Sequence, residues 1–252
     1  MTHDDAIVRP VRTKNTPALG PLALLAASEL DVQVLRQGLD LTASRPLYMS
    51  RLHYKMTDPK QPVVVGPIMG APYAVMLLEI LRCWGVQKAI FIGWCGSIDQ
   101  RARIGDIIVP TGAWIDEGTS VHYGQCATAA VQPDEDLKEM LHLGLQQGRK
   151  TFHSGSIWTT DAIFRETRAQ LLRYQQLGAL AVEMELSALL SAAAFYGFAM
   201  AAILTVSDEL FTFRWQPGFK TEAFKFCRIE ACSLLIDLIK PQSDLSIDNE
   251  HR

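Results

Sequence analysis

Apolar residues form two kinds of pattern that alternate along this chain. Some make short continuous runs, such as residues 63–66 and 89–92, which are typical of strands buried on both faces. Others recur at helical spacing, as they do in residues 30–39. The predicted strands lie at about residues 23–27, 48–55, 63–66, 89–92, 106–110 and 199–206. The predicted helices lie at about residues 30–39, 71–84, 133–147, 165–177, 182–195 and 221–238.

The alternation of strands and helices continues through the whole chain, which indicates an α/β fold. We expect a single domain over residues 17–240, built on a central mixed, mainly parallel sheet flanked by helices. Residues 1–16 combine charges and prolines without periodicity, so they predict an N-terminal arm. Residues 241–252 are equally polar and predict a flexible C-terminal tail.

The longest uncharged stretch, residues 186–206, has the length of a membrane span. Acidic residues stand just before and just after it, and Tyr196-Gly197 interrupts it where a helix could end. A buried helix followed by a buried strand is therefore the better interpretation.

Composition and charge narrow the function further. The chain has 24 Lys and Arg residues against 27 Asp and Glu residues, a net charge of -3, and no basic run that would indicate nucleic acid or an anionic membrane. Its 5 cysteines include no C-x-x-C pair, and no set of side chains has metal-ligand spacing, so neither a metal nor an organic cofactor is expected. The acidic start lacks the basic and apolar regions of a signal peptide, which favours a cytoplasmic protein that acts on a small molecule.

Three carboxylates stand next to predicted buried elements. Glu183 and Glu185 frame Met184 at the start of an apolar helix, and Ser207-Asp208 closes an apolar strand. Ligands of α/β sheets bind beyond the carboxyl ends of the strands, where such an acid can exchange a proton with them. Two structural roles remain open, because acids suit a helix N-terminus and Ser-Asp suits a helix cap.

Taken together, these motifs resemble the purine nucleoside phosphorylase and uridine phosphorylase superfamily. Residues 182–185, about twenty apolar residues, and residues 206–208 follow one another as they do in that family. Further segments resemble the family in order and spacing: 66–72, 92–97, 103–108, 116–123 and 159–162. The resemblance implies the three-layer nucleoside phosphorylase-like architecture and a homo-oligomer, a dimer or a hexamer built of dimers.

The resemblance also implies cleavage of the N-glycosidic bond of a nucleoside through a ribosyl cation-like transition state. Glu185, Met184 and Glu183 would bind the ribose, and Asp208 would protonate the departing base. Ile163, Phe164 and Ser207 would contact the base. Asp208 favours purine nucleosides, whereas residues 116–123 are similar to the uridine-specific branch, so both stay open with purine preferred.

Phosphate is the expected co-substrate, but most of the cations with which the family binds it are missing. Arg45 matches an arginine that the family shares across its dimer interface, and Arg165 could replace a lost one. Gly93 and Trp94 occupy the family's second glycine turn, where Trp94 replaces a hydroxyl residue.

The loss of these cations leaves two alternatives to phosphorolysis. A hydrolytic nucleosidase would use water, activated by Asp31 or Glu29, although both also suit the first turn of a helix. The third possibility is a protein that binds a nucleoside without cleaving it.

Overall fold

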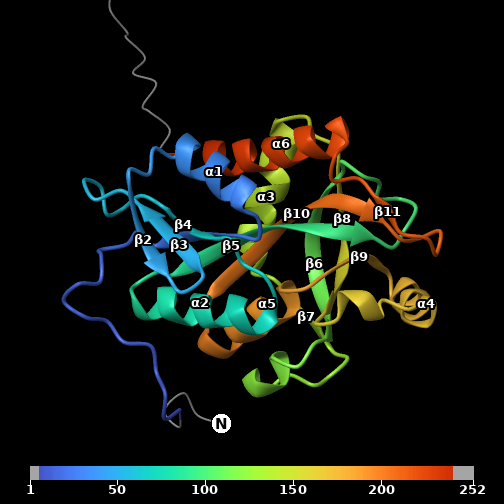
Figure 1. The fold of residues 1–252 in the computed structure, drawn as a ribbon, viewed down its shortest axis with the longest axis horizontal. Helices are drawn as coiled ribbons and strands as arrows, with labels where there is room; N and C mark the ends of the chain where they lie inside the picture. The colour runs from blue at the N-terminus through green and yellow to red at the C-terminus, as the bar shows by residue number, and fades with distance from the viewer. Residues whose placement is uncertain (1–5, 241–252) are drawn as a thin grey trace, which may run out of the picture.

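The computed structural model describes residues 6–240 of the chain. Within these residues a mixed 11-stranded sheet is flanked by helices, as Figure 1 shows. The strands are β1 (Leu22–Ala26), β2 (Ala43–Leu47), β3 (Ser50–Tyr54), β4 (Val63–Gly66), β5 (Lys88–Ser97), β6 (Ile107–Asp116), β7 (Ala130–Val131), β8 (Phe152–Thr160), β9 (Ala179–Glu183), β10 (Ala199–Glu209) and β11 (Gln216–Pro217). The helices are α1 (Glu29–Gly38), α2 (Ala71–Cys83), α3 (Glu135–Gln147), α4 (Arg168–Gln176), α5 (Leu186–Tyr196) and α6 (Glu222–Ile239), with short 3-10 turns at Ser120–Tyr123 and Ile163–Arg165.

The sheet curls until part of it closes on itself. Its order is β11-β10-β6-β8-β9-β5-β1-β4-β3-β2, and β10 pairs with β5 as well. The strands β5, β10, β6, β8 and β9 therefore form a closed ring, while β1, β4, β3 and β2 extend from it. The long pairings β5–β10 and β6–β8 are parallel, and the β2–β3 hairpin is antiparallel.

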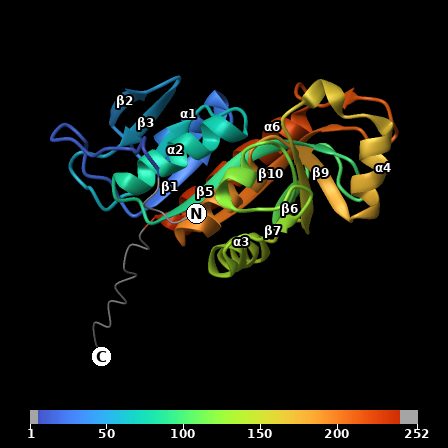
Figure 2. The same ribbon diagram turned by 90° about the horizontal axis from the view of Figure 1, so that it is seen from below.

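Helices cover the sheet on both faces, which completes the three layers. One core cluster packs α1, α3 and α6 against β1, β5 and β10, and another packs α2 and α5 against the opposite face. Figure 1 shows α1 and α6 on one side of the sheet and α2 and α5 on the other, and Figures 1 and 2 show α4 at the far end of the closed part. A third, smaller cluster joins α4 to β8 and β9 through Leu171, Tyr174 and Trp158.

The α/β class and the single sheet-centred domain are confirmed, but several boundaries differ from the prediction. Residues 182–183 end strand β9 and do not belong to the following helix, which begins at Leu186. Residues 93–97 continue β5 as a strand and are not a glycine turn, because β10 and β9 pair with them. Strands β2 and β8 were not predicted, since polar residues, and in β8 a glycine, interrupt their apolar patterns. Strand β9 was not predicted because its last residues were assigned to the helix that follows it.

The uncharged stretch of residues 186–206 forms a helix and then a strand, as predicted. Gly197, at φ 61 in the left-handed region, separates α5 from β10. Among residues 6–240 no helix has both the length and the apolar character that crossing a membrane requires.

The described part of the predicted arm, residues 6–16, contains neither helix nor strand. It packs on the end of α2, where the indole Nε1 of Trp84 donates to the carbonyl oxygen of Val11 at 3.0 Å. Residues 1–5 and the predicted tail, residues 241–252, lie outside the described residues.

Candidate active site

The predicted carboxylates meet around one residue of β5. Gly96 pairs with Val182 of β9 on one side and with Asp208 of β10 on the other. Neighbouring strands lie about 4.8 Å apart, so the chain segments that carry Glu183 and Asp208 are roughly 10 Å from each other. The pKa of the buried Cys95 thiol, next to Gly96, is raised by burial and by the charges of Asp208 and Glu183. The two ends of the predicted motif therefore face one site.

Glu183 caps helix α5 from the end of β9. Its Oε2 accepts hydrogen bonds from the backbone N–H groups of Glu185 at 2.8 Å and Leu186 at 2.7 Å. Its Oε1 accepts the hydroxyl of Thr159 at 2.5 Å. Burial and the neighbouring Glu185 raise the pKa of Glu183. Because both oxygens are bonded within the chain, the structure gives Glu183 the capping role that the sequence had left open.

Glu185 is the buried carboxylate with an oxygen left for a ligand. Its side chain is 6% exposed, and Oε1 accepts the backbone N–H of Gly70, which precedes α2, at 2.5 Å. Burial raises the pKa of Glu185. The backbone N–H of Met184 also lies near this carboxylate and, like that of Gly70, lowers its pKa. A pair of sugar hydroxyls would supply the hydrogen bonds that this carboxylate lacks. Met184, between the two acids, is half-buried.

Asp208 lies on β10 beside a bulge and is half-buried. The hydroxyl of Ser207 donates to its Oδ1 at 2.6 Å, and the indole Nε1 of Trp215 donates to its Oδ2 at 2.9 Å. Ser207 also donates to the carbonyl oxygen of Cys95, at 3.2 Å. No helix follows this Ser-Asp pair directly, so the alternative role as a helix cap is excluded.

Glu166 is a second acid near Asp208, and it belongs to none of the motifs that the sequence predicted for the site. It follows the 3-10 turn Ile163–Arg165 and precedes the N-cap of α4. Burial and the charge of Asp208 raise the pKa of Glu166 to about 7. A carboxyl group with this pKa can accept or donate a hydrogen bond near neutral pH.

An ion pair and an indole occupy the region beside the start of α1. Asp31 is fully buried, and its Oδ1 accepts Nη1 of Arg228 from α6 at 2.8 Å. Its Oδ2 accepts the indole Nε1 of Trp94 at 2.8 Å. Burial raises the pKa of Asp31, while Arg228 and Trp94 oppose that rise. The Trp94 ring packs edge-on against Phe224 at 5.0 Å between centroids.

The other predicted acceptor residues lie apart from this ion pair. Nη1 of Arg45 donates to the carbonyl oxygen of Asn15 at 2.8 Å, and its guanidinium lies 5.4 Å from the centre of the Trp84 ring. Arg165 is exposed on the 3-10 turn. Gly93 lies inside β5, where a Cβ atom would come within 2.7 Å of the Phe91 ring. The glycine at this position therefore serves packing.

Two of the predicted base-contacting residues are exposed on the turn that leads to Glu166. Ile163 is 52% exposed and Phe164 is 97% exposed, both on the 3-10 turn that leads to Glu166. Trp215 is 64% exposed on the segment between β10 and β11. Apolar surface beside an acid is suited to an aromatic base.

A buried network that the sequence did not reveal supports the start of α5. Glu117, after β6, accepts the backbone N–H of Ser120 at 3.0 Å and the hydroxyl of Ser187 at 3.0 Å. The backbone N–H of Ser187 donates to the Thr159 hydroxyl at 2.9 Å, which itself donates to Glu183. The network thus fixes the helix turn that follows Glu185. Among residues 6–240, no three His, Cys, Asp or Glu side chains are placed to bind a metal ion together.

Comparison with known proteins identifies the family. The family model of the phosphorylase superfamily matches residues 17–241. The chain belongs to the phosphorylase superfamily. A DeoD-type purine nucleoside phosphorylase of Clostridium novyi is 31% identical over 155 residues, which are 61% of this chain and 66% of that relative. The aligned part therefore spans just under two thirds of the length of this phosphorylase superfamily relative.

Solved structures of the phosphorylase superfamily share the fold. Uridine phosphorylase from Vibrio fischeri has a TM-score of 0.73 and 18% identity, over 88% of this chain and 92% of that one. AMP nucleosidase from Bacteroides thetaiotaomicron has a TM-score of 0.68 and 20% identity, over 87% of this chain and 89% of that one. The same architecture thus occurs in a phosphorylase and in a nucleosidase.

Proposed function

We propose that this chain cleaves the N-glycosidic bond of a nucleoside, preferably a purine nucleoside, with water as the acceptor. The buried ion pair of Asp31 and Arg228 beneath Trp94 is the observation that carries the choice of acceptor. Strand β9, which leads to Glu185, and strand β10, which carries Asp208, both pair with Gly96, and this arrangement supports the cleavage itself.

Glu185 and Asp208 would have different roles in the reaction. Glu185, held by Gly70, would accept the ribose hydroxyls and place its negative charge near the sugar as positive charge develops there. Asp208 would donate a proton to the departing purine, which then leaves as a neutral base. The exposed ring of Phe164 would contact the base.

The region beside α1 is unsuited to a phosphate dianion. A helix N-terminus attracts anions, but the first turn of α1 already carries Glu29 and Asp31. The cation closest to this turn that the structure reveals, Arg228, is paired with Asp31. A dianion placed here would meet a carboxylate and an indole instead of clustered cations, whereas neutral water meets no such repulsion.

Phosphorolysis is the second candidate, and the sequence relatives favour it. The chain is 31% identical over 155 residues to a DeoD-type purine nucleoside phosphorylase, and this similarity supports phosphorolysis. Arg45, half-buried beside Asn15, would then supply a phosphate ligand to a neighbouring subunit, as the resemblance implies.

Product analysis separates the two candidates. The purified chain is incubated with inosine, adenosine, guanosine and uridine, each with and without phosphate, and the products are separated by chromatography. We expect release of a purine base at a rate that phosphate changes less than about twofold, together with free ribose. Ribose 1-phosphate formed only in the presence of phosphate would instead establish phosphorolysis, and no release from any nucleoside would contradict both candidates.

Replacing Glu185 with glutamine is expected to lower kcat/KM by about 10- to 100-fold, the effect of losing hydrogen bonds to a charged group. Stability should change in the opposite direction. The pKa of Glu185 is higher in the folded chain than in the unfolded chain, where it is about 4.5. The unfolded chain therefore loses this proton first, and the stability of the wild-type chain falls as the pH rises above about 4.5. Glutamine does not ionise, and we expect the variant's melting temperature at pH 8 to exceed that of the wild type by about 5 °C.

Thermal unfolding between pH 5 and pH 8, measured beside the nucleoside assay, checks both effects. Glu135→Gln, on the exposed first turn of α3, is the matched control and should leave rate and stability unchanged. A parallel pH dependence of melting in the wild type and in Glu185→Gln would show that Glu185 is not the group that titrates.

A further inference from the structure

We propose that Trp215 is a positioning residue for the proton donor Asp208, holding its carboxyl group toward the base through the indole N–H. The proposal rests on the role of Asp208 in the proposed function. Trp215 lies outside the sequence motifs that contain Glu185 and Asp208. The 2.9 Å bond between Nε1 of Trp215 and Oδ2 of Asp208 is its central observation.

A small hairpin determines where Trp215 lies. Strand β11 pairs with the end of β10, so that Pro217 stands opposite Asp208 and Gln216 opposite Glu209. The backbone N–H of Gly218 donates to the carbonyl oxygen of Ser207 at 2.8 Å. The chain reverses at Phe213, whose φ of 59 lies in the left-handed region. These contacts bring Trp215 back to Asp208, which lies seven residues before it in the chain.

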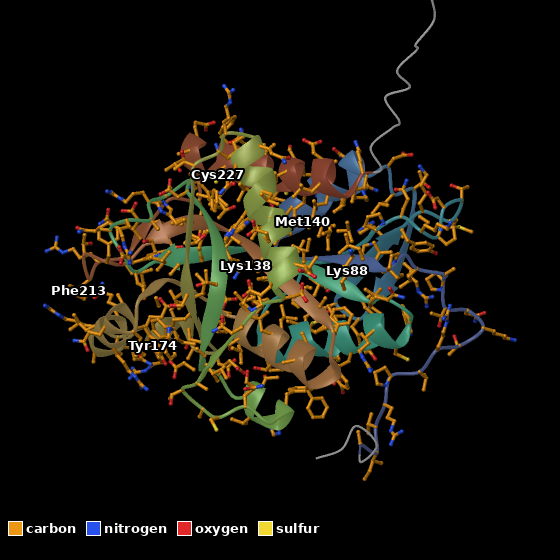
Figure 3. All side chains as sticks on the ribbon, turned by 180° about the vertical axis from the view of Figure 1, so that it is seen from behind. Lys88, Lys138, Met140, Tyr174, Phe213 and Cys227 are labelled. Carbon is orange, nitrogen blue, oxygen red and sulfur yellow. The ribbon has the colours of Figure 1, made fainter. Side chains whose placement is uncertain are left out.

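A contact with α4 holds the outer end of the same hairpin. The guanidinium of Arg168, at the start of α4, lies 4.4 Å from the centre of the Phe213 ring. In Figure 3, Phe213 lies at the edge of the molecule beside α4, the helix that carries Tyr174. On the inner side, the backbone N–H of Leu210 donates to the carbonyl oxygen of Ser97 at 2.7 Å. The hairpin is therefore attached at both ends, and Trp215 lies between them.

The groups around Asp208 show which of its oxygens the indole of Trp215 fixes. Ser207 donates to Oδ1, and Gly96 lies so close that a Cβ atom there would be 3.0 Å from Oδ2. The ionisable groups that face Asp208 are Glu166 from the turn before α4 and the Cys95 thiol from β5. Within residues 6–240 no lysine, arginine or histidine forms an ion pair with Asp208. The indole N–H is thus the donor that fixes Oδ2, and a neutral donor orients the acid without the charge that would hold it ionised.

The test compares two substrates that differ in their need for a proton. Cleavage of a purine nucleoside requires protonation of the base, whereas 4-nitrophenyl β-D-ribofuranoside releases a stable phenolate without an acid. Trp215→Phe keeps an aromatic ring and removes the N–H. We expect kcat/KM for inosine to fall about tenfold and kcat/KM for the nitrophenyl riboside to change less than twofold. Equal losses on both substrates, or no loss on inosine, would overturn the proposal.

A double-mutant cycle gives an independent measurement on inosine alone. If Trp215 acts through Asp208, Trp215→Phe should have almost no further effect in the Asp208→Asn chain, whereas a loss of tenfold in both backgrounds would contradict the proposal. Lys220→Gln, at an exposed position just after the hairpin, is the matched control and should leave the rates on both substrates unchanged. Assays with and without phosphate keep the choice of acceptor separate. If the wild-type chain cleaved neither riboside, the proposed function itself would fail, and the role of Trp215 with it.

Discussion

Asp208→Asn is expected to lower the turnover of a purine nucleoside by about 10²-fold or more, as the loss of a general acid does. The amide has the shape of the carboxyl group, and its single oxygen can accept the hydrogen bond of either Ser207 or Trp215, but it cannot deliver a proton to the base. Because a neutral purine is a much better leaving group than its anion, the chemical step should slow while binding changes little. We therefore expect the loss in kcat, with KM nearly unchanged.

Steady-state kinetics on inosine, with thermal unfolding as a check on folding, measures this effect. Asp136→Asn, which changes an exposed acid on α3, is the matched control and should behave as the wild type does. An Asp208→Asn chain with wild-type kcat would remove Asp208 from the mechanism. A chain that loses activity only because it unfolds would be recognised by a lowered melting temperature.

Arg228→Met is expected to destabilise the folded chain by about 3 to 5 kcal/mol at neutral pH, the cost of removing one partner from a buried ion pair. Asp31 is fully buried and would keep Trp94 and Cys232 as hydrogen-bond donors, but no cation to balance its charge. For a chain of this size the melting temperature should fall by about 10 °C. Methionine fills much of the same space, so the loss reflects charge more than packing.

The pH dependence gives this prediction a second signature. The pKa of Asp31 is already raised by burial, and loss of Arg228 would raise it further. The Arg228→Met chain should therefore be most stable at low pH, where Asp31 is protonated, and should lose stability as the pH rises through the raised pKa.

The double variant Asp31→Asn with Arg228→Met, which has no buried charge left at this place, should recover most of the loss. Lys225→Met, on the exposed side of α6, is the matched control and should change stability by less than about 0.5 kcal/mol. A loss in Arg228→Met that is the same at pH 5 and pH 8, or that persists in the double variant, would show that packing around Arg228 matters and the ion pair does not.

The sequence predicted the strands whose apolar runs are continuous, because burial on both faces requires apolar residues at every position. Strand β4 has the predicted bounds, and β1 and β10 begin within one residue of them. It failed for β9, whose final residues Val182 and Glu183 precede an apolar helix and were assigned to that helix. A side chain that caps a helix from the preceding strand breaks no pattern in the sequence, so the boundary depends on hydrogen bonds such as those of Glu183.

The sequence also selected the residues that carry the proposed chemistry. Glu185 and Asp208 stood out because carboxylates next to apolar runs need partners. The structure brings β9, which leads to Glu185, and β10, which carries Asp208, to both sides of Gly96. The sequence did not indicate the roles of Glu166 and Arg228 or the hydrogen bond from Trp215 to Asp208. The reason is that each of these residues interacts with a residue that is distant in the chain or lies in a different element. Arg228 did leave one signal, as a cation on the face of α6 that carries Cys227, Ala231 and Cys232.

By itself, then, the sequence determined the alternation of strands and helices, the family and the carboxylates at the strand ends, since these depend on local pattern and on burial. Only the tertiary structure decided how those carboxylates differ. Both oxygens of Glu183 accept hydrogen bonds from the chain, whereas Glu185 accepts one from Gly70 and can accept others from a ligand. Asp31 forms an ion pair with Arg228, which lies 197 positions away. Whether a carboxylate caps, binds or pairs depends on which donors surround it, and folding brings those donors from distant parts of the chain.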